Sequence, residues 1–172
     1  MYLVTGASGF IGKHLLDVLI QRGKLIYCVV RPSSASAFRD LVEARWPSAR
    51  SQIEIVPGDI SAPSCGLSAS TINALEGSVE QVFHLAALYD MRASLEDSQN
   101  ANVEGTRNAC RLAEALDATL HYVSSIAVAG DYKGYFREDM FDEGQKHKHP
   151  YFLTKFLAEK VVREECQTAY RI

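Results

Sequence analysis

A tyrosine and a lysine placed four residues apart form the pair of side chains in this sequence best suited to proton transfer. Tyr151 and Lys155 follow Pro150, a residue that fits the first turn of a helix, so both are predicted to lie on one helical face. A neighbouring ammonium favours phenolate and lowers the pKa of a tyrosine toward neutrality, which suits its hydroxyl for acid/base chemistry. The same spacing also occurs as a surface pair on ordinary amphipathic helices.

A serine hydroxyl is predicted to lie near this pair. Ser125 follows the apolar run Thr119 to Val123, which is typical of a buried strand. Parallel sheets bind ligands at the carboxyl ends of their strands, where a hydroxyl can hydrogen-bond a substrate oxygen. Ser124 competes for this role, and a serine at a strand end can also simply cap the following loop.

A glycine-rich turn near the start of the chain is typical of a phosphate-binding loop. The segment TGASGFIG, Thr5 to Gly12, follows a predicted strand and opens a predicted helix, the context that a dinucleotide fingerprint requires. Its first glycine permits the tight turn, its second lets the backbone approach a pyrophosphate, and its third allows close packing of helix on strand. The candidate cofactor-binding residues here are Gly6, Ser8, Gly9, Phe10, Ile11 and Gly12.

The end of the second predicted strand indicates which dinucleotide is bound. An acidic residue there would recognise the ribose 2'-hydroxyl of NAD, but the sequence has Val30 and Arg31, with no Asp or Glu from residue 18 to residue 39. Side chains that can instead reach a 2'-phosphate are Arg31, Ser33, Ser34 and Arg39. The sequence therefore predicts NADP(H), although each arginine could also be an ordinary solvated side chain. Asp59 and Ile60, after the third strand, are candidates for the adenine side, and Asp59 could equally cap the next segment.

Short apolar runs alternate with helical segments along the whole chain. The predicted strands are Tyr2 to Thr5, Leu25 to Val30, Ile53 to Val56, Gln81 to Leu85 and Thr119 to Val123, with another beginning at Ala169. Predicted buried helix faces carry Ile11, Leu15, Val18 and Leu19 before Gly23, and later Val103, Cys110, Ala113 and Leu116. This alternation predicts a doubly wound α/β (Rossmann) fold, with a mostly parallel sheet and helices on both faces. The segment Ser125 to His149 is predicted to be a long, functional or mobile loop.

Composition narrows the function further. The 172 residues fit one domain, residues 1–172, and a net charge of -3 argues against a nucleic-acid partner. Four scattered cysteines suggest neither a metal site nor a disulfide framework. Without a signal peptide or a membrane-spanning run, a cytoplasmic location is expected. Because the chain stops inside a predicted strand, we expect it to be the N-terminal fragment of a longer protein.

Six motifs in order resemble the extended branch of the short-chain dehydrogenase/reductase superfamily. They are TGASGFIG, PGDI, FHLAA, NVEGT, VSSIAVAG and YFLTK. The resemblance selects Ser125 over Ser124 by its distance from Gly130, makes Tyr151 the proton donor, and has Lys155 hold the nicotinamide ribose. It also places Ala86, Ala87 and Asn102 beside the cofactor.

More narrowly, segments such as FHLAALYDM and NVEGTRNACRLAEAL are similar to bacterial NADPH-dependent fatty acyl-CoA reductases and their multidomain relatives. This implies reduction of an acyl thioester, carried by coenzyme A or acyl carrier protein, to an aldehyde, with or without a second reduction to an alcohol. It also implies a homodimer. The C-terminal substrate lobe of that family is expected to be missing, so we expect cofactor binding but little turnover from these residues alone.

Two alternative functions are a nucleotide-sugar epimerase or dehydratase and a catalytically silent NADP(H)-binding module. Arg31 argues against the first, because such enzymes usually keep NAD bound. The complete set of Ser125, Tyr151 and Lys155 argues against the second.

Overall fold

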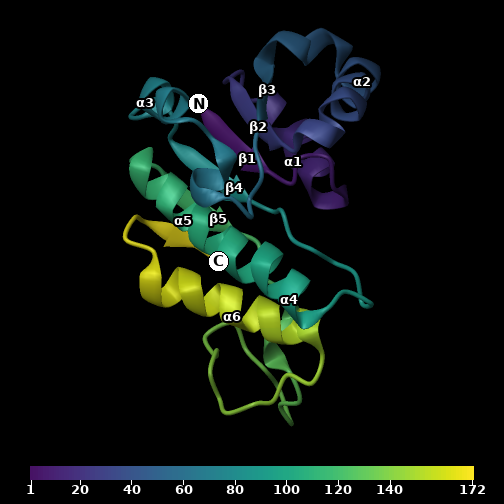
Figure 1. Ribbon diagram of the computed structural model, residues 1–172, viewed down its shortest axis with the longest axis vertical. Helices are drawn as coiled ribbons and strands as arrows, with labels where there is room; N and C mark the ends of the chain where they lie inside the picture. Colours follow the sequence, from purple (N-terminus) through teal and green to yellow (C-terminus); the bar gives the residue numbers. More distant parts are fainter.

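One six-stranded parallel sheet forms the centre of the protein, whose computed structural model describes residues 1–172 (Figure 1). Its strands are β1 (Tyr2–Thr5), β2 (Ile26–Val30), β3 (Ile53–Pro57), β4 (Gln81–His84), β5 (Thr119–Tyr122) and β6 (Tyr170–Arg171). Their order is β3-β2-β1-β4-β5-β6, and in register Val4 of β1 lies between Cys28 of β2 and Phe83 of β4. The predicted fold is confirmed, and the strand order reverses between β1 and β4.

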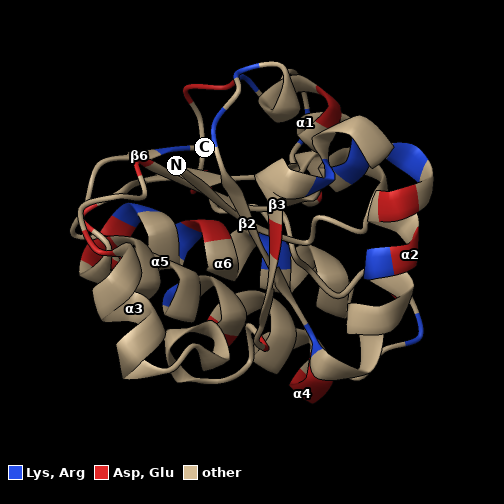
Figure 2. Ribbon diagram, turned by 90° about the horizontal axis from the view of Figure 1, so that it is seen from above, with Lys and Arg blue, Asp and Glu red and all other residues tan.

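Helices cover both faces of the sheet. Seen from above, α1 and α2 lie on one side of it and α3, α5 and α6 on the other (Figure 2). These helices are α1 (Phe10–Ile20), α2 (Ala35–Arg45), α3 (Ala69–Leu75), α5 (Gly105–Ala115) and α6 (Pro150–Glu165). A short helix, α4 (Leu95–Ser98), runs through a π-helical segment, Gln99–Glu104, into α5. Within the chain, no helix combines the length and apolarity needed to cross a bilayer.

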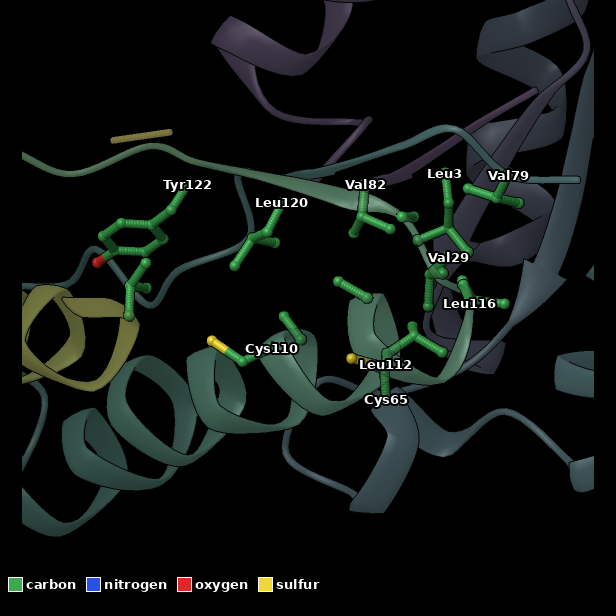
Figure 3. Packing of buried hydrophobic residues seen from close by; sticks show 14 of the residues in the cluster. Leu3, Val29, Cys65, Val79, Val82, Cys110, Leu112, Leu116, Leu120 and Tyr122 are labelled. Atoms are coloured by element: carbon green, nitrogen blue, oxygen red, sulfur yellow. The ribbon is translucent and has the colours of Figure 1, made fainter. Parts of the chain in front are cut away.

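The larger core cluster lies between the sheet and α5. Cys110 and Leu112 of α5, together with Leu116 at its C-terminal cap, face Val82 of β4 and Leu120 of β5 (Figure 3). The face predicted for this helix from its sequence spacing is therefore confirmed. All four cysteines are free thiols, and no cluster of His, Cys, Asp or Glu is arranged to hold a metal ion.

The buried face predicted for α1 is confirmed at Leu19 and in part at Leu15, but it is wrong at Ile11 and Val18. Ile11 and Val18 are 54% and 52% exposed, whereas Gly12, Leu16 and Leu19 are buried. The reason lies at Gly12, where a Cβ would stand only 2.3 Å from the Gly6 carbonyl oxygen. Because the backbone at Gly12 packs directly on the preceding turn, the residues four and seven positions later turn inward.

This corrected orientation is testable by truncating one buried and one exposed side chain of α1. We expect Leu16→Ala to reduce the free energy of unfolding by about 2–5 kcal/mol, because it leaves a cavity in the core. We expect Val18→Ala to change it by less than about 0.5 kcal/mol. Urea unfolding monitored by circular dichroism measures both, and equal losses would contradict the orientation.

Candidate functional site

A cavity of about 690 Å³ opens where the strand order reverses, at the carboxyl ends of β1 to β4. Open α/β sheets bind ligands at this topological switch point. The cavity is walled by the loops that follow these four strands and by the segment that leads into α5. The predicted cofactor residues that line it are Gly6, Ser8, Gly9, Arg31, Asp59, Ile60, Ala86 and Ala87.

The glycine-rich loop forms the floor of this cavity, and its shape fits a dinucleotide. Gly6 has φ +75°, and a Cβ there would lie 2.6 Å from the Ala86 nitrogen, so the loop packs directly against the segment after β4. Gly9 caps α1 without any side-chain hydrogen bond. The N–H groups of the first turn of a helix have no partner within the helix, so they stay available to an anion.

The remaining predicted cofactor residues lie outside the cavity lining. Phe10 and Ile11 are exposed on the first turn of α1, and Gly12 is buried against the backbone of Gly6 and Ala7. Arg39 is exposed on α2. Arg31 is also exposed, but it lines the cavity together with Ser34.

Sequence reasoning missed one wall of the cavity. Residues 85–93, after β4, contribute six lining residues, of which only Ala86 and Ala87 were predicted from the sequence. The others are Leu85, Leu88, Asp90 and Ala93 from this segment, with Asp97, Asn100 and Ala101 beyond it. The only local signal was that these residues directly follow a predicted strand, Gln81 to Leu85.

A buried chain of hydrogen bonds supports the floor from below. The Thr5 hydroxyl lies 2.7 Å from Nδ1 of His84, and Nε2 of His84 lies 3.2 Å from the Thr106 hydroxyl. Thr106 donates its proton to the Asn102 carbonyl, so Nε2 must be the protonated nitrogen and Nδ1 must accept from Thr5. The Thr5 oxygen in turn accepts the Ala86 N–H. Burial, and then the charge of Lys155, lower the pKa of His84 to about 3, so the ring is neutral.

Asn102 is buried beside this chain and holds the missed wall in place. Its Oδ1 accepts the Leu88 N–H at 2.7 Å, and its Nδ2 donates to the Leu88 carbonyl and to the Thr154 hydroxyl. All three contacts are internal, so Asn102 reaches a cofactor only through the segment it positions. Its place in the π-helical turn accords with the frequent occurrence of such turns at functional sites.

The two serines after β5 have different partners. Ser124 donates its hydroxyl proton to Glu159, a buried carboxylate on α6 that also receives two N–H groups of Arg163. Ser125 accepts the Ala127 N–H at 3.2 Å and donates to no protein group. The Ser125 proton therefore remains available to an external acceptor. Glu159, which the sequence analysis did not single out, accepts the Ser124 proton and so removes this serine as a substrate donor.

Lys155 is buried and fixed to the end of β5. Its Nζ donates to the Tyr122 hydroxyl and to the Val123 carbonyl, both at 2.8 Å. No hydrogen bond joins it to Tyr151, the partner that the sequence suggested. Burial lowers the pKa of Lys155 to about 8, and the charge of Glu159 partly opposes this shift.

The lowered pKa of Lys155 predicts how its contribution to stability varies with pH. An unfolded lysine keeps its proton to its ordinary pKa of 10.5, whereas folded Lys155 releases it at about 8. Between these values the unfolded state binds more protons, so the contribution of this group to the free energy of unfolding rises with pH. We expect urea unfolding to show wild type gaining stability relative to Lys155→Met across that window. A constant difference would contradict the shift.

Comparisons with known proteins identify the family and the fold of this chain. The model of the family described as Male sterility protein matches residues 4–172. The hybrid PKS-NRPS synthetase phm1 of Pyrenochaetopsis sp is 31% identical over an alignment 172 residues long, which covers 99% of this chain and 4% of that protein. The crystal structure of the terminal R domain from the myxalamid PKS-NRPS biosynthetic pathway has a TM-score of 0.84 and 33% identity, over 98% of this chain and 46% of that one.

A structure of UDP-glucuronic acid 4-epimerase from Bacillus cereus is 22% identical, with a TM-score of 0.72 over 98% of this chain and 54% of that one. At that identity the likeness shows the fold alone. The chain thus spans about half of the matched structures and a small part of the synthetase. The narrower resemblance to fatty acyl-CoA reductases stays a prediction. The chain belongs to the Male sterility protein family, an NAD(P)-binding branch of the extended short-chain dehydrogenases/reductases.

Proposed function

We propose that this chain is the NADP(H)-binding part of an oxidoreductase that reduces an acyl thioester to an aldehyde and, in a second round, to an alcohol. The observation that carries the proposal is the free hydroxyl proton of Ser125, two residues after Val123, whose carbonyl accepts a hydrogen bond from Lys155 of α6. Ser124 is occupied by Glu159, so only one of the two serines can bind a substrate oxygen. The cavity over the glycine-rich loop supplies room for a dinucleotide.

The residues that would hold the cofactor come from four loops. The backbone of the loop from Gly6 to Gly12 would bind the pyrophosphate, and Asp59 with Ile60 would flank the adenine. Arg31 and Ser34, at the end of β2, would bind a 2'-phosphate, which favours NADP(H) over NAD. Ala86 and Ala87 would border the nicotinamide side. When bound, NADPH supplies the hydride.

Side chains of this protein would bind the carbonyl oxygen of the substrate and supply the proton. Ser125 would hydrogen-bond the thioester carbonyl oxygen, and Tyr151 would deliver a proton to that oxygen as the carbonyl carbon is reduced. The product, a hemithioacetal, loses the thiol to give the aldehyde. Lys155, already fixed by Tyr122 and Val123, has one N–H left with which to hold the ribose.

Similarity to the reductase domain of a synthetase supports a thioester substrate. The myxalamid R domain is the terminal domain of a PKS-NRPS pathway, and such synthetases carry their intermediates as thioesters. Arg31, at the point where an NAD-dependent nucleotide-sugar enzyme would carry an acid, argues against the epimerase or dehydratase alternative. The Ser124 hydroxyl is bonded within the protein, whereas the Ser125 hydroxyl proton has no partner there. A serine left free to bind a substrate argues against a silent binding module.

The 2'-phosphate site is tested by calorimetric titration with NADPH and with NADH. We expect Arg31→Ala to weaken NADPH binding by about 10- to 100-fold, as for a lost hydrogen bond between charged groups. NADH binding should be unchanged. Arg39→Ala is the matched control, because this arginine lies outside the cavity. Equal loss for both dinucleotides would refute the assignment of Arg31.

The proton donor is tested by removing a single oxygen. In the full-length protein, Tyr151→Phe should lower kcat for acyl thioester reduction by about 100- to 10,000-fold, the usual contribution of a general acid. The Kd for NADPH should change little. Tyr135→Phe, at a side chain that is 94% exposed, controls for the substitution. Retained turnover in Tyr151→Phe would exclude this residue as the donor.

A further inference from the structure

The histidine that caps the N-terminus of α6 uses both of its ring nitrogens. Nδ1 of His149 accepts the backbone N–H of Tyr151 at 3.1 Å and so caps the helix. Nε2 lies 3.1 Å from the carbonyl oxygen of Met91. A carbonyl can only accept, so Nε2 carries the proton and Nδ1 the lone pair, and a neutral imidazole satisfies both contacts.

The Met91 contact connects α6 to the segment that walls the cavity. Residues 85–93 are held by Asn102 at Leu88, and the Tyr89 ring packs edge-on against Tyr151 with centroids 4.9 Å apart. His149 adds a third attachment farther along, at Met91. The segment is thereby fixed to two helices along the stretch between the cavity and Tyr151.

A histidine at this position does more than cap a helix. Ser, Thr, Asp and Asn are the usual capping residues, because their short side chains reach the first backbone N–H groups. Asparagine also carries an N–H donor, but its amide nitrogen does not reach as far from the backbone as the Nε2 of an imidazole does. The rigid ring therefore sets the distance between the start of α6 and Met91, and Phe152 packs beside it at 5.8 Å between centroids.

We propose that His149 is a positioning residue that fixes Tyr151 relative to residues 85–93, so that the cavity wall and the start of α6 behave as one rigid unit. The inference rests on the proposed role of Tyr151 as proton donor and deepens it. His149 itself touches no reacting atom. It acts through the Tyr151 backbone on one side and the Met91 carbonyl on the other.

Two substitutions separate the two contacts. The amide oxygen of asparagine occupies about the position of Nδ1, so His149→Asn keeps the cap and loses the Met91 bond. The amide nitrogen of glutamine corresponds to Nε2, so His149→Gln keeps the donor and loses the cap. His14→Asn, on the exposed face of α1, is the matched control.

The full-length protein is examined by thermal unfolding, hydrogen exchange and steady-state reduction of an acyl thioester with NADPH. For His149→Asn we expect an unchanged Tm, and exchange at residues 89–92 faster by about fivefold, as for one lost hydrogen bond. We expect kcat to fall by about tenfold at an unchanged KM for the thioester, because the donor is misplaced rather than absent. His149→Gln should instead lower Tm.

The exchange measurement keeps this inference separate from the proposed function. If wild type reduces the thioester but His149→Asn matches wild type in both exchange and kcat, the positioning role is wrong and the proposed function stands. If wild type neither binds NADPH nor turns over, the proposed function fails. Exchange at residues 89–92 then still decides whether His149 holds the segment.

Discussion

A neutral imidazole buried at the end of β4 is the constraint on which the site depends. His84 links Thr5, at the start of the glycine-rich loop, with Thr106 on α5. Each hydrogen bond in this series has a single possible donor and acceptor. Burial lowers its pKa to about 3, so the ring keeps the same protonation state at physiological pH. A charged ring would reverse one contact and leave a buried donor unpaired, which costs about 1–3 kcal/mol or more.

Buried polar residues of the helix α6 also hold the candidate site together. Thr154, Lys155 and Glu159 are all buried polar residues on α6, and each has partners on elements that precede it in the chain. Burying a lysine near a glutamate is tolerable because each charge is hydrogen-bonded and the two offset one another. The result is that the strand end bearing Ser125 and the helix bearing Tyr151 cannot move independently.

Local patterns predicted the fold well because a buried strand or helix face requires apolar residues at regular spacing within a short stretch of sequence. The strands of the structure lie within one residue of the predicted ones, and the inward face of α5 was identified from spacing alone. The face of α1 was misassigned at Ile11 and Val18 because two adjacent stripes, one beginning at Ile11 and one at Gly12, are both compatible with the periodicity. Contact between Gly12 and Gly6 chose between them.

The sequence by itself determined the Rossmann fold, the glycine-rich loop and the residue types of the candidate site, since each depends on the order of residues over a short stretch. Tertiary structure decided which hydroxyl is free, which partner holds Lys155 and which segment closes the cavity. These contacts join residues 79 apart at Thr5 and His84, 58 apart at Met91 and His149, and 33 apart at Tyr122 and Lys155. Hydrogen bonding is directional and short in range, so such pairs form only after packing has brought distant elements together.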